Sequence, residues 1–399
     1  MGDFVNKRIY LDHAATTQMS GQVLEYMLPY LREEYGNPSS IYDIGSANKK
    51  TLLTARKKIA AVLSCEPQNI YFTSGGTESD NWALVGVAES RAGMGRHLIT
   101  TKMEHHAVLE TCRYLESRGY EVTYLDVDEL GMVDPAHVKR ALRPDTILVS
   151  IMTANNEIGS IQPIAQIGKI LKGCQALFHT DAVQAFGQIP LAPKELGVDL
   201  LSASAHKFYG PKGVGFLYIG DGIKLPSFLH GGKQERGMRA GTENVAFIAG
   251  MGEAARLAQE TMEERTKKEA GLRDYMIHRL EQEIPYCRLN GSRKSRLPGN
   301  VNMGFSFIDG ETIVIMLDME GICCSSGSAC SAGEAAASHV LKSIRLPDDI
   351  AKGSLRFTLG SETTKEDVDF AVDKIKMVLE KARKMNPAYT VFQKQNQKK

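Results

Sequence analysis

Short apolar runs alternate with amphipathic stretches along the N-terminal half of the chain. Each apolar run is bounded by turn residues and predicts a buried strand, whereas apolar residues spaced three or four positions apart predict helices. This alternation is typical of an α/β fold with a mostly parallel sheet covered by helices on both faces. The expected strands lie near residues 9–11, 70–72, 97–99, 122–125, 147–151, 176–179, 198–201 and 214–219, and the expected helices cover 46–64, 77–92, 106–118, 134–142 and 163–171.

The C-terminal part of the chain has a different pattern, which starts with a long charged helix expected over 245–283. Beyond it, apolar runs near 301–303 and 355–357 predict strands, and amphipathic stretches near 310–320 and 365–382 predict helices. We therefore expect a second, smaller α+β domain.

The domain boundaries follow from this change of pattern. The large domain is assigned residues 16–260, and the smaller domain takes residues 1–15 together with 261–382. The last stretch, 383–399, is polar and basic with little apolar periodicity, so we expect a loosely ordered tail.

The composition of the 399 residues is that of a globular enzyme, with 43% hydrophobic and 24% charged residues. A net charge of +1 gives no electrostatic reason to expect nucleic acid or a membrane as a partner. No stretch approaches the roughly 20 apolar residues of a membrane span, and the first residues do not resemble a secretion segment. The seven cysteines, an odd number, point to reduced thiols, so we expect a cytoplasmic protein.

Lys207 lies in the stretch 202–213, which follows one predicted strand and precedes another. The carboxyl end of a strand is where α/β sheets place ligands. A lysine held there can lose its proton and act as a nucleophile toward a carbonyl group. The alternative is an ordinary solvated lysine on a loop.

Asp181 ends the strand that precedes the one leading to Lys207. Two successive parallel strands would bring a carboxylate and an amine to the same crevice. An aspartate there can pair with the pyridinium nitrogen of pyridoxal phosphate, or it can simply cap the helix that follows. Gln184 is then a candidate donor to the phenolate oxygen of that cofactor.

A glycine-rich turn, Gly75-Gly76-Thr77, follows another strand and opens a helix. Glycines let a ligand approach the backbone, and free N–H groups at a helix N-terminus favour a phosphate. The alternative is that Thr77 and Asp80 serve only as helix caps.

His105 and His106 follow a further strand, where a histidine can stack on an aromatic ring and exchange protons near neutral pH. Together with Glu104 they also suggest a metal site. No further cluster of ligands with recognisable spacing exists, so we expect no metal.

The segment 323–333 consists only of cysteines and small residues. Small residues cannot pack a core, so we expect a mobile loop, and a cysteine on such a loop suits a thiolate nucleophile. Cys323 and Cys324 adjoin an apolar run and suit buried positions, whereas Cys330 has small neighbours on both sides. Cys330 is therefore the expected nucleophile.

Two further segments are candidates for binding an anion. Arg356 alternates with apolar residues in a predicted strand, where it can clamp a carboxylate through two parallel hydrogen bonds or form a plain salt bridge. The turn 235–244 contains Arg236, Arg239 and Thr242.

In order and spacing, these motifs resemble those of the cysteine desulfurases of the NifS/IscS kind. Those proteins are fold-type-I pyridoxal-phosphate enzymes of the class-V aminotransferase family. The matching motifs run from residue 10 to about 360, and only the tail lies outside them. They are Leu11-Asp12-His13-Ala14-Ala15-Thr16-Thr17, Gly75-Gly76-Thr77-Glu78-Ser79, Glu104-His105, Asn155-Asn156-Glu157-Ile158-Gly159, Asp181-Ala182-Val183-Gln184, Ser204-Ala205-His206-Lys207, Arg239-Ala240-Gly241-Thr242 and Ser326-Gly327-Ser328-Ala329-Cys330.

The resemblance implies a seven-stranded sheet in the large domain and pyridoxal 5'-phosphate as the cofactor. Lys207 would carry the cofactor and move a proton, Asp181 would hold the ring nitrogen, and His105 would stack on the ring. The remaining cofactor-binding residues implied are Gln184 at the ring oxygen, Gly76, Thr77, Ser204 and His206 around the phosphate, and Thr242 of the partner subunit in a homodimer.

The resemblance also implies that L-cysteine is the substrate. Asn156 and Arg356 would hold its carboxylate, and Cys330 would take its sulfur as a persulfide. A sulfur-acceptor protein such as an iron–sulfur scaffold would then receive that sulfur.

Several alternatives are open at this point. A related pyridoxal-phosphate lyase or aminotransferase would release selenium or an amino group, although a transaminase needs no thiol on a loop. A protein that binds the cofactor and only docks partners is a different class. The acceptor is open too, because the C-terminus does not resemble the scaffold-docking end of the housekeeping desulfurases. Iron–sulfur assembly, nitrogenase maturation and tRNA thiolation all fit.

Overall fold

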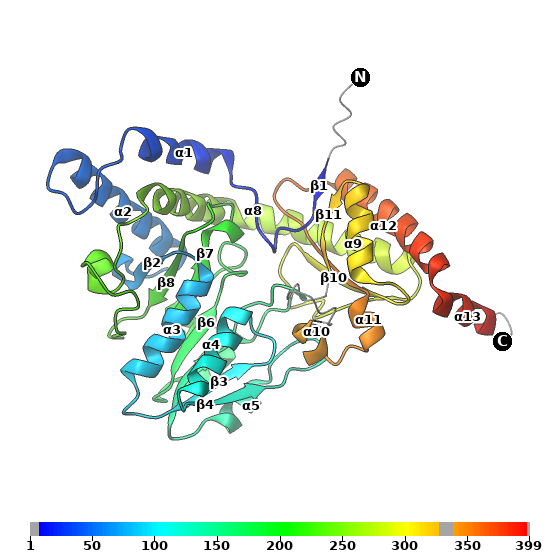
Figure 1. Cartoon of the computed structure of the whole chain (residues 1–399), viewed down its shortest axis with the longest axis horizontal. Helices are drawn as coiled ribbons and strands as arrows, with labels where there is room; N and C mark the ends of the chain where they lie inside the picture. Colours follow the sequence, from blue (N-terminus) through cyan, green and yellow to red (C-terminus); the bar gives the residue numbers. More distant parts are fainter. Residues whose placement is uncertain (1–7, 327–337, 397–399) are drawn as a thin grey trace.

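The computed structural model describes residues 8–326 and 338–396. Figure 1 shows a larger unit built around one extended sheet and a smaller unit with its own sheet, joined by the long helix α8 (Val245–Glu283). The chain starts in the smaller unit with β1 (Ile9–Tyr10) and then crosses to the larger unit, where α1 (Gly21–Arg32) lies.

The larger unit contains a seven-stranded sheet in the order β2-β8-β7-β6-β5-β3-β4. Among the described residues, only β8 runs against the direction of the other strands of this sheet. The mostly parallel seven-stranded sheet is therefore confirmed. Its strands are β2 (Ile70–Thr73), β3 (His97–Thr101), β4 (Glu121–Leu125), β5 (Thr146–Ser150), β6 (Leu177–Asp181), β7 (Leu200–Ser204) and β8 (Gly215–Ile219).

Helices cover both faces of this sheet. Successive side chains of a strand point to opposite faces, so two neighbouring residues of β7 show what lies on each face. Leu200 packs in a cluster with residues of α3 (Gly76–Ser90), whereas Leu201 packs in the cluster that contains residues of α1, α2 (Asp43–Val62) and α8. The other helices of this unit are α4 (His106–Ser117), α5 (Pro135–Ala141), α6 (Ile164–Leu171) and α7 (Pro193–Leu196), with the 3₁₀ turns η1 (Pro67–Asn69), η2 (Ala205–Lys207) and η3 (Gln234–Gly237). No helix in the described ranges has both the length and the apolar character needed to cross a bilayer.

The smaller unit combines a four-stranded sheet, in the order β12-β13-β10-β9, with the parallel pair β1-β11. Its core contains Ile9 and Leu11 together with Met276 and Leu280 from the end of α8. Its elements are β9 (Cys287–Leu289), β10 (Asn300–Phe305), α9 (Gly310–Met319), β11 (Ile322–Cys323), β12 (Ser325–Ser326), β13 (Ser354–Thr358) and α12 (Lys365–Met385).

Two short helices, α10 (His339–Ser343) and α11 (Asp348–Lys352), were not expected from the sequence. Val340, Leu341 and Ile344 belong to the apolar core of the larger unit, although this stretch was assigned to the smaller domain. The boundaries themselves stay a prediction.

The C-terminal stretch differs from the expected loosely ordered tail. Helix α12 continues to Met385, and a further helix, α13, spans Pro387–Asn396. Tyr389 and Phe392 are three positions apart and therefore share one helix face, which contacts the rings of Tyr286 and Phe307. The face is marked by the two rings of Tyr389 and Phe392, which are too few for an apolar periodicity that would predict this helix.

Phe392→Ala tests whether α13 is packed. The Phe392 ring lies 4.9 Å from that of Phe307 and 5.2 Å from that of Tyr286, measured between centroids. We expect the free energy of unfolding to fall by about 1–2 kcal/mol in urea denaturation, because both aromatic pairs are lost. Val391→Ala, at an exposed neighbouring position, should change it by less than about 0.5 kcal/mol. Equally small effects of both substitutions would contradict the packing described here.

Candidate functional site

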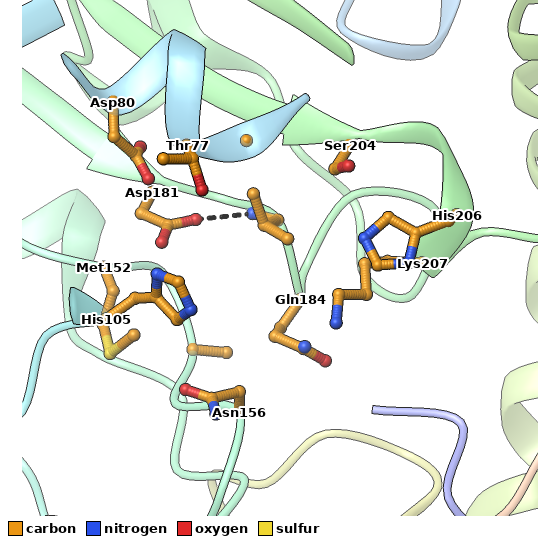
Figure 2. A pocket seen from close by; sticks show the side chains of 13 residues that line it. Thr77, Asp80, His105, Met152, Asn156, Asp181, Gln184, Ser204, His206 and Lys207 are labelled. Atoms are coloured by element: carbon orange, nitrogen blue, oxygen red, sulfur yellow. Dashed lines mark hydrogen bonds between the residues drawn. The ribbon is translucent and has the colours of Figure 1, made fainter. Parts of the chain in front are cut away.

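A cavity of about 250 Å³ lies at the carboxyl ends of the parallel strands, where a buried strand meets a turn or a helix start. Figure 2 shows that its polar side chains converge from several of these turns. It is lined by Gly76, Thr77, Asp80, His105, Met152, Ala154, Asn156, Asp181, Val183, Gln184, Ser204, His206 and Lys207.

Asp181 and Lys207 reach this cavity because β6 and β7 are parallel neighbours. Asp181 is the last residue of β6, and one of its carboxylate oxygens accepts a hydrogen bond of 2.9 Å from the backbone N–H of Val183. Burial raises the pKa of Asp181, and the nearby His105 and Lys207 oppose that rise. The carboxylate therefore needs a positive partner to stay charged.

Lys207 ends the turn η2 that follows β7. Its Nζ donates to the carbonyl oxygens of Ala14 at 2.6 Å and Ala15 at 2.8 Å. Burial, aided by the positive charge of Arg356, lowers the pKa of Lys207 to about 8. The expected nucleophilic character therefore has a physical basis, and the solvated-loop alternative does not describe this residue.

His105 is the N-cap residue of α4. Its Nδ1 accepts the backbone N–H of Ala107 at 3.1 Å, which places the proton of a neutral ring on Nε2. Burial lowers the pKa of His105, so the neutral form dominates at neutral pH. His106 is not among the residues that line the cavity.

The turn before α3 forms another wall. Gly75 has a φ of 153°, which a residue with a side chain rarely adopts, and a Cβ on Gly76 would lie 2.6 Å from Cγ2 of Val183. Thr77 and Ser204 place hydroxyl groups on the same wall. Asp80 lies inside α3 rather than at its cap, and only 1% of its surface is exposed.

The N-terminal loop, residues 12–17, is the part of the site that sequence reasoning left without a role. Besides holding Lys207, it accepts a hydrogen bond of 2.9 Å from Gln184 Nε2 at the carbonyl oxygen of Ala14. Thr16 Oγ1 lies 3.1 Å from His206 Nδ1. The motif could be recognised in the sequence. Its role could not be predicted, because many of its contacts are made by backbone atoms, which every residue type has.

Arg356 lies next to the cavity and not in its wall. Its Nη1 donates to the backbone oxygen of Asn156 at 3.2 Å, and its Nη2 donates to Asp12 Oδ1 at 2.8 Å. The plain salt bridge considered for this arginine therefore exists, and Asp12 was not foreseen as its partner.

Besides Arg356, one described residue expected at the site does not reach the cavity. Thr242 is exposed and does not line it. Cys330 lies outside the described residues. In residues 8–326 and 338–396, no group of three or more His, Cys, Asp or Glu side chains is placed to hold a metal ion.

Gly76→Ala tests how tightly the cavity wall is packed. Alanine is favoured over glycine in a helix by about 1 kcal/mol. Pressing a new methyl group against Val183 costs about 1–3 kcal/mol, so we expect the free energy of unfolding to fall by up to about 2 kcal/mol in urea denaturation.

Val183→Ala provides the matched background, because it removes the methyl group that the new side chain would meet. In that background Gly76→Ala should be neutral or stabilising. An equal loss of stability in both backgrounds would contradict the close contact.

Comparison with known proteins agrees with this geometry. The family model described as aminotransferase class-V matches residues 9–370. A relative from Dictyoglomus turgidum named cysteine desulfurase IscS is 52% identical over 383 residues, which cover 96% of this chain and 97% of that protein. A relative of the same name from Clostridium botulinum is 48% identical over 99% of this chain and 100% of its own length.

A solved structure described as a NifS-like protein superposes with a TM-score of 0.89 at 40% identity, covering 94% of this chain and 99% of the other. The resemblance inferred from the motifs is thereby confirmed. The chain belongs to the aminotransferase class-V family, within its group of NifS- and IscS-like cysteine desulfurases.

Proposed function

We propose that this chain is a cysteine desulfurase that transfers the sulfur of L-cysteine to its own Cys330 and releases L-alanine. The observation that carries the proposal is the convergence of Lys207, Asp181 and His105 on one cavity in a chain of this family. Each of the three lies at or just after the carboxyl end of a different parallel strand, where open α/β sheets bind their ligands.

The chemistry of the cavity fits pyridoxal 5'-phosphate, the cofactor of this family. Asp181 offers a buried carboxylate for which a protonated ring nitrogen is a stabilising partner. The N-terminus of α3 offers backbone N–H groups for a phosphate, and Thr77 and Ser204 add hydroxyl groups. Gly76 carries no side chain that would press against Val183, which also lines the cavity.

Lys207 is proposed to hold the cofactor covalently and to move a proton. With a pKa of about 8, roughly a tenth of its amine is neutral at pH 7, far more than for an ordinary lysine. Bound pyridoxal phosphate supplies an electron-accepting ring that stabilises negative charge on the substrate carbon. His105, neutral and protonated on Nε2, is proposed to stack on that ring and to exchange protons with the substrate.

Sulfur transfer to Cys330 balances without any oxidant. The carbon–sulfur bond of cysteine breaks and a sulfur–sulfur bond to Cys330 forms. The carbon takes up a proton in place of the sulfur, which gives alanine. The neighbouring thiols are poorly suited to this step, because burial raises the pKa of Cys324 to about 12 and also raises that of Cys323.

The persulfide is proposed to pass to a sulfur-acceptor protein such as an iron–sulfur scaffold. A reducing, cytoplasmic location suits this chemistry. It is supported by the free thiols of the six cysteines outside 327–337.

The proposed enzyme is a homodimer in which Thr242 serves the phosphate of the partner subunit. Thr242 is exposed and absent from the wall of the cavity in its own chain. Its loop is fixed to the larger unit through Arg239, whose Nε donates to Glu78 Oε1 at 2.9 Å.

The connection between α1 and α2 supports a homodimer as well. It exposes the apolar side chains of Tyr35, Tyr42 and Ile41, the last with 98% of its surface accessible, which suits an interface.

The activity is tested by measuring alanine and sulfide from L-cysteine with the purified chain. Wild-type protein should form both, and peptide mass analysis should find the extra sulfur on Cys330. Cys330→Ser should keep the visible absorption of the cofactor and lose persulfide formation, whereas Lys207→Ala should lose that absorption. A persulfide on Cys323 or Cys324 in active Cys330→Ser protein would contradict the assignment, and keto-acid formation would indicate a transaminase.

Mixed dimers test the role of Thr242. Loss of one hydrogen bond to a charged phosphate should weaken cofactor retention by about tenfold in Thr242→Ala protein. Mixing it with Lys207→Ala protein should restore retention in half of the sites of the mixed dimers. Each restored site combines Lys207 of one chain with Thr242 of the other. Dialysis followed by absorbance measures retention, and a lack of restoration would show that Thr242 acts within its own chain or not at all.

A further inference from the structure

Two polar side chains from distant parts of the chain meet at Arg356. Its Nη2 donates to Asp12 Oδ1 at 2.8 Å and to Ser325 Oγ at 2.9 Å, and Ser325 Oγ itself donates to Asp12 Oδ1 at 2.8 Å. Asp12 belongs to the N-terminal loop, Ser325 to β12 and Arg356 to β13, where Ser325 and Arg356 are paired across the sheet. The three side chains therefore form a closed triangle.

The guanidinium is held on both of its terminal nitrogens. Nη1 donates to the backbone oxygen of Asn156 at 3.2 Å, and Asn156 lines the cavity. Only 8% of Arg356 is exposed, so its charge needs a counter-ion, which Asp12 supplies. An arginine fixed in this way loses little further freedom when a ligand binds.

The donors of Arg356 can be counted. Nη2 carries two N–H groups, and the triangle uses both of them. Nη1 carries two as well, and one is used by the backbone oxygen of Asn156, a residue that lines the cavity, which leaves the other for a ligand. Nε finds no hydrogen-bond partner among the described residues and is shielded from solvent. A carboxylate arriving from the cavity therefore meets Nη1 without competing with Asp12 for the same N–H groups.

The same loop also reaches the reactive amine. Two and three residues after Asp12, the carbonyl oxygens of Ala14 and Ala15 accept from Lys207 Nζ. The backbone N–H of Ala14 donates to Thr358 Oγ1 at 2.8 Å, which fixes the loop to β13 beside Arg356. Asp12 therefore lies on a short stretch of backbone that is fixed at Ala14 to β13, beside Arg356, and at Ala14 and Ala15 to Lys207.

We propose that Asp12 is a positioning residue for substrate binding. It saturates Nη2 of Arg356 and thereby directs the substrate carboxylate to the Nη1 side, next to Asn156. This inference rests on the proposed role of Arg356 in holding the carboxylate of L-cysteine. The competing explanation is an ordinary salt bridge that only stabilises the packing of the N-terminal loop against β13.

Binding of L-alanine to the holoenzyme separates these explanations. L-Alanine has the carboxylate and the amino group of the substrate and no thiol, and its binding is followed by the change in cofactor absorption. We expect Asp12→Asn to raise the Kd for L-alanine by about tenfold, because the neutral amide holds the guanidinium less firmly. Arg356→Gln should raise that Kd by about a hundredfold.

The decisive measurement is the double variant. If Asp12 acts through Arg356, adding Asp12→Asn to Arg356→Gln should leave the Kd for L-alanine unchanged. Additive effects, or an unchanged or tighter Kd in Asp12→Asn alone, would overturn the proposal. A Kd that Arg356→Gln leaves unchanged would overturn the role of Arg356 itself, and the inference with it.

Two further variants guard against a purely structural effect. Ser325→Ala removes the hydroxyl group that contacts both Asp12 and Arg356. It should raise the Kd for L-alanine by about two- to threefold, and only in protein that retains Arg356. Glu320→Gln breaks a different ion pair of the smaller unit, that with Lys374 at 2.6 Å, and should leave the Kd unchanged. A shift in the Glu320→Gln control equal to that of Asp12→Asn would show that Asp12 acts only through stability.

Discussion

The parallel pairing of β6 with β7 is the constraint on which the proposed site depends. It brings the ends of two strands to the same edge of the sheet, so that Asp181 and the turn carrying Lys207 share one cavity. A slip of one residue would turn each of these side chains to the opposite face of the sheet. The fully buried strands on either side prevent such a slip, because their apolar residues would then have to change faces as well.

The carboxylate of Asp181 and the amine of Lys207 are held by different parts of the chain. Asp181 is fixed by the backbone N–H of a residue close in sequence, whereas Lys207 is held by carbonyl groups almost two hundred positions away. The sheet therefore supplies the framework, and the N-terminal loop, which connects β1 of the smaller unit to α1 of the larger unit, completes the cavity. This explains why the loop contacts both Lys207 and β13.

Much of the fold and the centre of the site could be predicted from the sequence because they depend on local patterns. Continuous apolar runs mark the strands of the large sheet, and Asp181, His105 and Lys207 each lie at the end of such a strand or a few residues after it. The pairing of Asp12 with Arg356 could not be predicted, because 344 positions separate the two residues and no local pattern links them. Helix α13 was missed because two half-buried rings, Tyr389 and Phe392, mark the face that packs against the smaller unit.

Helix α8 has a consequence for how the protein unfolds. Its 39 residues span about 60 Å, and its two ends lie in different cores: Ala254 in that of the large sheet and Leu280 in that of the smaller unit. A helix loses hydrogen bonds cooperatively once its interior is disrupted. Melting of either core would remove support from the helix that both cores share. We therefore expect the turn after β7, which carries the amine, and the strand β13, which carries the guanidinium, to unfold together.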